Sequence, residues 1–293
     1  MFSSPYNAST SAGQTPAVPE GHTIHRHALQ QRRELAGHRL ATDVVQGRFA
    51  ASAMTLDGRR LDDVEAWGKH LFQWWEGGEV LHVHLGLYGR WRHQQSPPPP
   101  MRGEVRLRLI GPSHTWDLSG ATACEVLSPD DRERIIARLG PDPLRSDADP
   151  GRFLDRAARS RAPIGTLLLD QAALAGIGNV YRAEVLFLGG IHPHRVARDL
   201  TDAERSGLWI EIAHQLRLGL RQGRIVTRRR HELDRPASRV PRSEALYVYH
   251  CDICRVCATP IRSTTLAARR LDFCPRCQPR RPRRGHTPPV PPP

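Results

Sequence analysis

Four cysteines near the C-terminal end constrain the fold of this chain more than any other feature. They form the pairs Cys254-Arg-Val-Cys257 and Cys274-Pro-Arg-Cys277, with sixteen residues between the pairs. Two such pairs at this separation are typical of a zinc ribbon, in which four thiolates surround one Zn²⁺ ion. The sequence therefore predicts a small C-terminal module held by one structural zinc ion on Cys254, Cys257, Cys274 and Cys277.

Cys251 leaves the first pair ambiguous, because it stands three residues before Cys254 and offers a second CxxC spacing. We favour Cys254 with Cys257 and interpret Cys251 as a neighbouring thiol. Disulfides are the alternative to zinc, but a CxxC pair is short for a structural bridge, and the first residues lack the charged and apolar regions of a signal peptide. Four thiolates leave no coordination position for water, so the zinc is expected to be structural only.

The charge balance points to a polyanionic partner. The 293 residues include 43 Lys and Arg against 30 Asp and Glu, which gives a net charge of +13. Such a surface releases counterions when it meets nucleic acid, although a merely basic, solvated surface has the same composition. Lys69 is the single lysine. No apolar run approaches the roughly 20 residues that a membrane helix needs, so we expect a cytoplasmic, nucleoid-associated protein that does not bind membranes.

Composition divides the chain into three folded parts between two polar ends. Residues 1–18 are rich in Pro, Gly and Ser and are predicted to be a disordered leader, and residues 280–293 a disordered, basic, Pro-rich tail. Between them we expect a domain over residues 19–140, a helical domain over residues 141–245 and the zinc ribbon over residues 246–279.

Hydrophobic periodicity assigns a fold class to these parts. A helix is predicted over residues 21–35, strands over 71–75, 80–85 and 105–109, and a helix that begins at Pro129 after the cap Ser128. Residues 162–188 contain two helical patterns around the turn 175–179, and a capping box at Thr201 opens a longer helix. The predicted fold is α+β: an N-terminal antiparallel β-sandwich flanked by helices, then a helix, two turns and a helix, then the zinc ribbon.

Five short motifs in order carry a resemblance to a known family. They are PEGHT at 19–23, WGKHL at 67–71, HLGLYG at 84–89, LDQ at 169–171 with LAGIGNVYR at 174–182, and the four-cysteine ribbon. Over about residues 19–278 the chain resembles the bacterial formamidopyrimidine-DNA glycosylase/endonuclease VIII family, and it is most similar to actinobacterial endonuclease VIII. The resemblance implies a monomeric base-excision repair enzyme that acts on duplex DNA containing oxidised bases or abasic sites.

The resemblance also implies roles for three catalytic residues. Enzymes of this family attack the sugar C1′ with the amine of an N-terminal proline, form a Schiff base and cut the strand by β/δ elimination, and that proline corresponds to Pro19. Glu20 corresponds to the general acid and base, and Lys69 to the lysine that holds phosphate and aids the chemistry. A capping carboxylate and a solvated lysine are the plainer interpretations of Glu20 and Lys69.

Five further residues correspond to DNA contacts of the family. Leu87 and Tyr88 resemble the wedge that fills the gap left by an extruded base. Asn179 and Arg182 resemble phosphate contacts of the two-turn motif, and Arg269 resembles the arginine that a zinc ribbon lays against the backbone. Since methionine is absent from the wedge position, we expect oxidised pyrimidines rather than formamidopyrimidines as the main substrate.

Pro19 is internal in this sequence, and an amide nitrogen cannot form a Schiff base. Residue 18 is valine, and a GTG codon reads as valine inside a gene but as methionine where translation begins. We therefore hypothesise that translation starts at position 18 and that removal of the methionine exposes Pro19. The alternatives are a real leader that is cleaved, or one that is retained and leaves an inactive DNA-binding protein.

Other interpretations stay open at this point. A non-catalytic zinc-ribbon protein that binds DNA explains the charge and the cysteines but gives Pro19 and Glu20 no purpose, and an RNA- or ribosome-associated ribbon protein does not explain the leucine-tyrosine wedge. We interpret Glu184 and Asp170 as ties between helices. His22, His25 and His27 are spread around the first helix and are expected to be surface polar groups or neighbours of a phosphate.

Overall fold

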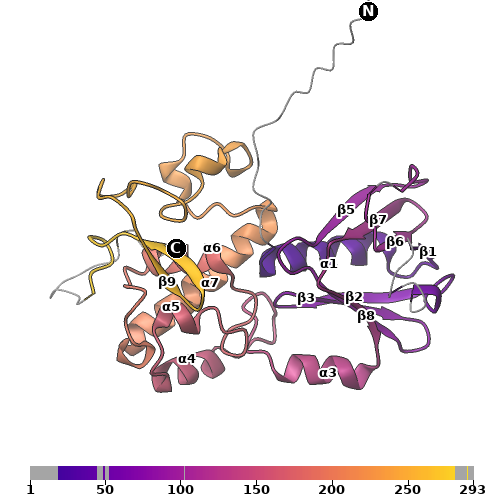
Figure 1. Ribbon diagram of the computed structural model, residues 1–293, viewed down its shortest axis with the longest axis horizontal. Coiled ribbons are helices and arrows are strands. Elements are labelled where there is room, and N and C mark those ends of the chain that lie inside the picture. Colours follow the sequence, from indigo (N-terminus) through magenta and orange to yellow (C-terminus); the bar gives the residue numbers. More distant parts are fainter. Residues whose placement is uncertain (1–18, 45–48, 50–52, 102, 281–288, 290–293) are drawn as a thin grey trace, which may run out of the picture.

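The structure is a computed structural model that describes residues 19–44, 49, 53–101, 103–280 and 289. The predicted leader, the hypothesised start at position 18 and all of the predicted tail except residues 280 and 289 lie outside these residues. The described chain forms two halves, a sheet-rich half from the first part of the sequence and a helical half that carries the C-terminal ribbon (Figure 1). No described helix is both long enough and apolar enough to span a bilayer.

Two antiparallel four-stranded sheets form the first half. One sheet has the order β1-β6-β7-β5 and the other β2-β3-β4-β8. Their strands are β1 (Ala41–Asp43), β2 (Leu61–Trp67), β3 (His70–Trp75), β4 (Val80–His84), β5 (Arg90–Gln95), β6 (Leu107–Ile110), β7 (His114–Ser119) and β8 (Ala123–Leu127). Their apolar faces enclose one core, which includes Leu71, Trp75, Leu109 and Trp116. This is the sandwich that the alternating pattern predicted.

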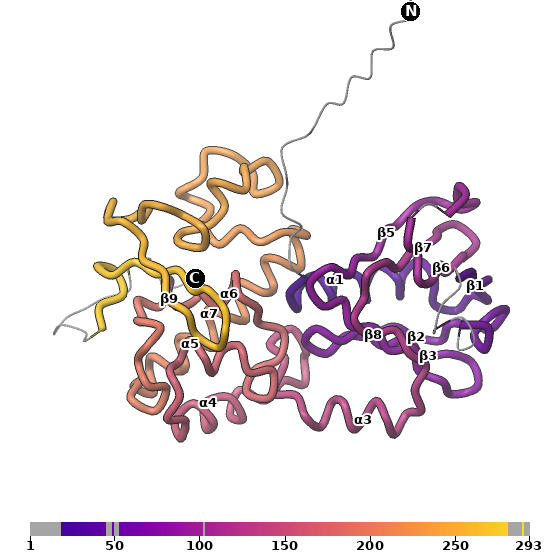
Figure 2. The backbone as a smooth tube through the Cα atoms, in the orientation of Figure 1, coloured from indigo at the N-terminus to yellow at the C-terminus, as the bar shows by residue number. Residues whose placement is uncertain are grey.

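Helix α1 (Gly21–Leu35) contacts both sheets of the sandwich (Figure 2). Ile24, Ala28 and Leu35 are buried in the sandwich core. Two polar contacts fix the helix: Gln73 of β3 donates to Gln31 at 2.7 Å, and Trp116 of β7 donates to Glu34 at 3.0 Å. The predicted helix over 21–35 is confirmed to the residue.

The second half is helical. It contains α4 (Pro150–Arg159), α5 (Ile164–Leu167), α6 (Asn179–Leu188) and α7 (Asp202–Gln222), and α3 (Pro129–Ala137) leads into it from the sandwich. Thr201 and Glu204 form the predicted capping box of α7. Short 3-10 turns lie at η1 (Ala197–Asp199), η2 (Arg230–Glu232), η3 (Ala237–Arg239) and η4 (Arg242–Glu244), the last three in the segment between α7 and the ribbon.

The predicted α+β fold is confirmed, with differences at the ends of elements. The strand expected over 105–109 begins two residues later as β6, and the helix expected before the two-turn motif is only the four-residue α5. The polar side of β6 is not solvated as the alternation implied. Arg108 is 5% exposed because it pairs with Asp117, with Nε 2.6 Å from the carboxylate.

Candidate active site and zinc ribbon

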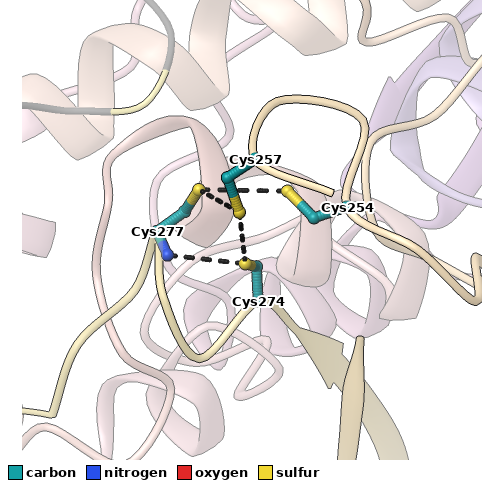
Figure 3. Close-up of side chains that lie close together, drawn as sticks. All are labelled: Cys254, Cys257, Cys274 and Cys277. Carbon is teal, nitrogen blue, oxygen red and sulfur yellow. Dashed lines mark hydrogen bonds between the residues drawn. The ribbon is translucent and has the colours of Figure 1, made fainter. Parts of the chain in front are cut away.

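The C-terminal ribbon brings together the four predicted cysteines. It consists of two loops and the hairpin of β9 (Arg262–Leu266) and β10 (Arg269–Phe273). The Sγ atoms of Cys254, Cys257, Cys274 and Cys277 lie within 4.8 Å of one another, with Sγ–Sγ distances of 3.5–3.9 Å along the dashed contacts in Figure 3. Four sulfurs at about 2.3 Å from one ion require separations of about 3.8 Å.

The geometry therefore fits one structural Zn²⁺ ion, and it resolves the ambiguity of the first pair. Cys251 is outside the cluster, and its Sγ lies 3.8 Å from the carbonyl oxygens of Leu246 and Tyr249. The ion would stabilise the ribbon and so orient its hairpin, because two knuckles of this size bury little apolar surface of their own.

A cavity of about 430 Å³ gathers predicted site residues from four separate stretches of sequence. Pro19, Lys69, Leu87 and Arg269 all contribute to its wall. The rest of the wall consists of His84, Gly86, Thr166, Leu169, Asp170, Gln171 and Ala267. The cavity thus lies where the sandwich, the helical half and the ribbon hairpin meet, and a ligand inside it would contact all three.

Glu20 lies beside this cavity and is fully buried. Its carboxylate accepts hydrogen bonds from the backbone N–H groups of Gly178 and Val180, both at 2.8 Å. These groups belong to the N-terminus of α6, so a side chain at the start of α1 caps a helix of the other half. Burial raises the pKa of Glu20 above its usual 4.5, and the charge of Lys69 and the backbone donors oppose that rise.

Four glycines permit this close contact between the halves. The backbone N–H of Gly21 donates to the carbonyl of Gly176 at 2.8 Å, and a Cβ on Gly21 would stand 2.8 Å from the Gly176 Cα. A Cβ on Gly68 would stand 3.0 Å from the Gly176 nitrogen, and one on Gly178 would stand 2.5 Å from the Glu20 carboxyl carbon. Gly176 itself has φ of +96°, which favours glycine. Side chains at these positions would push the halves apart.

Lys69 stands at the tip of the hairpin between β2 and β3. The hairpin has a two-residue turn, since Trp67 pairs with His70, and Gly68 in the turn has φ of +58°. Burial lowers the pKa of Lys69 below its usual 10.5, Glu20 opposes that shift and Arg269 adds to it. The pKa of Glu20 is thus raised and that of Lys69 lowered, so the two values are shifted toward each other, which is common in sites that transfer protons.

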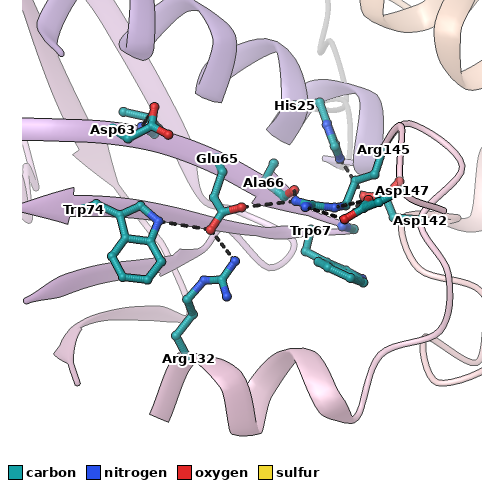
Figure 4. A network of polar contacts seen from close by, with 12 residues as sticks. His25, Asp63, Glu65, Ala66, Trp67, Trp74, Arg132, Asp142, Arg145 and Asp147 are labelled. Carbon is teal, nitrogen blue, oxygen red and sulfur yellow. Dashed lines mark hydrogen bonds and ion pairs between the residues drawn. The ribbon is translucent and has the colours of Figure 1, made fainter. Parts of the chain in front are cut away.

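A polar network holds that hairpin against the second half (Figure 4). Asp142 is 1% exposed and accepts from the Gly68 N–H at 2.7 Å, and its carboxylate is 2.6 Å from His25 Nε2. Nearby, Glu65 of β2 accepts from Trp74 and Arg145, at 3.1 Å each, and from Arg132. The network fixes the position of Lys69 relative to α1.

The predicted wedge and the ribbon arginine are exposed, and Leu87 and Arg269 line the cavity. Leu87 is 46% exposed and Tyr88 78%, although both are large apolar side chains. Arg269 is exposed at the start of β10, just after the two-residue turn of the ribbon hairpin. Exposed apolar side chains near an arginine are typical of a surface that binds nucleic acid and inserts side chains between bases.

Arg182 is a correction to the predicted DNA contacts. It is 0% exposed, and its guanidinium donates to the backbone carbonyls of Gly165, Leu266 and Arg270 at 3.1–3.2 Å. It therefore ties α6 to the ribbon hairpin and does not face a DNA backbone. Asn179 also donates to the Arg270 carbonyl, at 2.9 Å, but it is only half-buried at the start of α6.

The interpretation of three histidines as surface groups is wrong for His22, which is 3% exposed and packs edge-on against Tyr181. His27 is half-buried and packs edge-on against Trp116. Burial lowers the pKa of both His22 and His27 to about 4. His25 reaches Asp142, as described above. Sequence reasoning also missed Asp142 itself, for which the only signal was its place in Pro141-Asp142-Pro143, a rigid segment between the halves.

Comparisons with known proteins agree with this architecture. Sequence models match at residues 15–118 ("Formamidopyrimidine-DNA glycosylase N-terminal domain"), 139–231 ("Formamidopyrimidine-DNA glycosylase H2TH domain") and 254–280 ("Zinc finger found in FPG and IleRS"). "Endonuclease 8 1" of Mycobacterium tuberculosis is 44% identical over 268 residues, which cover 89% of this chain and 100% of that protein. The chain belongs to the formamidopyrimidine-DNA glycosylase/endonuclease VIII family.

Other similar proteins are less alike in sequence. "Formamidopyrimidine-DNA glycosylase" of Methylococcus capsulatus is 32% identical over 235 residues, covering 76% of this chain and 84% of that protein. The fold is shared with Lactococcus lactis Fpg in complex with abasic-site DNA, at a TM-score of 0.75 and 23% identity over 89% of this chain and 99% of that one.

The predicted resemblance is confirmed, and with it the coarse function: the chain is a DNA glycosylase of base excision repair with a structural zinc finger.

Proposed function

We propose that the protein is a bifunctional DNA glycosylase and abasic-site lyase that removes oxidised pyrimidines from duplex DNA. The observation that carries this proposal is the cavity that Pro19, Lys69, Leu87 and Arg269 line together. A nucleophile, a cation, a base-stack wedge and a phosphate contact are the parts that such a reaction needs in one place. We retain the division into residues 19–140, 141–245 and 246–279 as part of the proposal, together with a monomeric enzyme.

Pro19 is proposed as the nucleophile. Its amine forms a bond to C1′ while the bond from C1′ to the damaged base breaks, and the base leaves with the electron pair and a proton. Glu20 is placed to move protons at the sugar and the leaving base, because its carboxylate is buried beside Pro19 with its charge supported by Lys69. Opening of the sugar gives the Schiff base, and loss of a C2′ proton then expels the 3′ phosphate.

The chemistry requires that Pro19 carry a free amine. A chain that begins Met-Pro19 gives this terminus once the methionine is removed. At the start of α1 the positive end of the helix dipole disfavours a protonated amine, which favours the nucleophilic form near neutral pH.

DNA contact is proposed at the exposed wedge and the ribbon arginine. Leu87 and Tyr88 would enter the duplex, while Arg269 and the exposed part of Asn179 would contact phosphates on either side of the extruded nucleotide. Arg182 would act only by holding the ribbon hairpin in place, since its guanidinium is buried.

Borohydride trapping tests the proposal. Zinc-loaded protein beginning at Pro19 is mixed with duplexes that contain an abasic site, thymine glycol or 8-oxoguanine, and compared with the 293-residue form. We expect a covalent adduct from the short form on the abasic and thymine glycol duplexes and none from the form with a blocked amine.

Other outcomes have distinct meanings. A stronger adduct on 8-oxoguanine than on thymine glycol would overturn the pyrimidine preference alone. Specific binding to damaged DNA without any adduct from the short form would overturn the lyase mechanism and favour a non-catalytic DNA-binding protein.

A further inference from the structure

A second cluster of metal-binding side chains lies in the sandwich, away from the cavity. Glu34 of α1, His93 of β5 and His114 of β7 each place a donor atom within 4.8 Å of the other two. Glu34 is fourteen residues along α1 from Glu20, about 20 Å at the usual rise per residue. The cluster is therefore separate from both the catalytic cavity and the ribbon.

Glu34 is held in place as a metal ligand must be. It is 8% exposed, and its Oε2 accepts from Trp116 Nε1 at 3.0 Å and lies 2.9 Å from His93 Nε2. The other oxygen lies 3.2 Å from a guanidinium nitrogen of Arg33, whose side chain is 73% exposed. The carboxylate is thus fixed by the indole, while the cation beside it can swing into solvent.

The two histidines approach this carboxylate from adjacent strands. Their rings stack with centroids 4.9 Å apart and planes 20° apart. The Nδ1 of His114 is 2.9 Å from Ser113 Oγ, a contact that leaves its Nε2 for another partner. His93 is exposed on the outer side, so water can complete a coordination sphere.

We propose that Glu34, His93 and His114 bind a second divalent metal ion, with zinc as the natural occupant. Two imidazoles and one carboxylate form a donor set that suits Zn²⁺ and its late first-row neighbours and has little affinity for Mg²⁺ or Ca²⁺. Donor atoms about 2.0 Å from a tetrahedral ion lie about 3.3 Å apart, so the 2.9 Å between Glu34 Oε2 and His93 Nε2 would open slightly on binding. Because the ligands come from three elements, the ion would brace α1 against β5 and β7.

Metal stoichiometry of the untagged, full-length protein tests the site. After equilibrium dialysis against micromolar Zn²⁺, elemental analysis should find two zinc ions per chain, and the double variant His93→Asn/His114→Asn should retain one. Glu34→Gln keeps an acceptor for Trp116 but removes the charge, and should weaken the second site at least tenfold. His231→Asn, at an exposed histidine outside the cluster, should still bind two.

Cobalt substitution identifies which site each ion occupies. Co²⁺ in the ribbon gives intense thiolate charge-transfer bands, whereas Co²⁺ on nitrogen and oxygen donors gives only weak visible bands. A folded wild type with a single ion, or two ions retained in the double variant, would overturn the proposal. If the double variant unfolds, His114→Asn alone decides the matter, because its side chain is not part of the core.

Discussion

Glu20 and Glu184 are both 0% exposed, but they differ in their hydrogen-bond partners, in their charged neighbours and in whether a cavity adjoins them. Glu184 accepts from the backbone N–H groups of Tyr247, Val248 and Tyr249 at 2.8–2.9 Å and from the hydroxyl of Thr227. Glu20 accepts from two backbone groups, has Lys69 as a charged neighbour and adjoins a cavity.

Burial raises the pKa of both carboxylates above 4.5, so the shift alone does not separate them. Glu184 is enclosed by donors and ties α6 to Thr227 and to residues 247–249, which lie outside the helices, so it does not join two helices as interpreted. Glu20 retains a cation and a route to a substrate. A buried carboxylate therefore indicates catalysis only where a partner charge and an open space accompany it.

The largest expected effect comes from exchanging each acid for its amide. Glu20→Gln should lower the rate of base excision by the folded protein by about 10²- to 10⁴-fold, because the amide cannot transfer protons. Both variants should lose stability, because each amide group would face a backbone donor, at a cost of about 3 kcal/mol for Glu184→Gln, but Glu184→Gln should leave the rate of the folded protein unchanged. Single-turnover kinetics and thermal melts of both variants distinguish the roles, and equal loss of rate in the two would erase the contrast.

The next largest effect is expected from a side chain that displaces the Glu20 carboxylate. A methyl group at position 178 would lie 2.5 Å from the carboxyl carbon, so Gly178→Ala should displace Glu20 and reduce excision by about 10²-fold. The matched control is Gly207→Ala in α7, where no atom lies within 4 Å of the added carbon. That variant should be as active as the wild type and at least as stable. Unchanged kinetics in Gly178→Ala would mean that the position of the carboxylate is not critical.

The charge of Lys69, which has no counterpart beside Glu184, is tested through the pH dependence of excision. Because burial places the pKa of Lys69 below 10.5, excision should decline as alkaline pH removes its proton. Lys69→Arg keeps a positive charge at all accessible pH values and should abolish this decline, at a cost of about 10-fold in rate from altered geometry. Rate profiles between neutral and alkaline pH measure both effects. An alkaline limb that persists unchanged in the variant would assign it to another group.

The smallest effect is expected from removing one hydrogen-bond donor to Glu184, which should lower stability and leave the excision rate unchanged. Thr227→Val preserves the side-chain shape but deletes the hydroxyl that donates to Glu184, and should lower stability by about 1–3 kcal/mol. Denaturant melts measure the loss, and excision by the folded fraction should match the wild type. A reduced excision rate in fully folded Thr227→Val would mean that the Glu184 contacts of α6 also affect the chemistry.

The sequence allowed prediction of the parts with local signals. Periodicity located α1 and the strands, a capping box located α7, and spacing located the zinc cysteines. It could not show that Arg182 is buried, because its backbone partners come from residues more than 80 positions away in the ribbon. Nor could it show that Gly21, Gly68 and Gly176 meet, since that contact depends on how the halves dock.

Because Glu20 caps α6 of the other half, base excision requires that both halves be folded and docked. An isolated sandwich would leave this carboxylate in water without its backbone donors, and an isolated helical half would lack it altogether. A nascent or partly unfolded chain could still hold DNA through its arginines but would be unable to excise a base. The interface between the halves thus limits base excision to completely folded molecules.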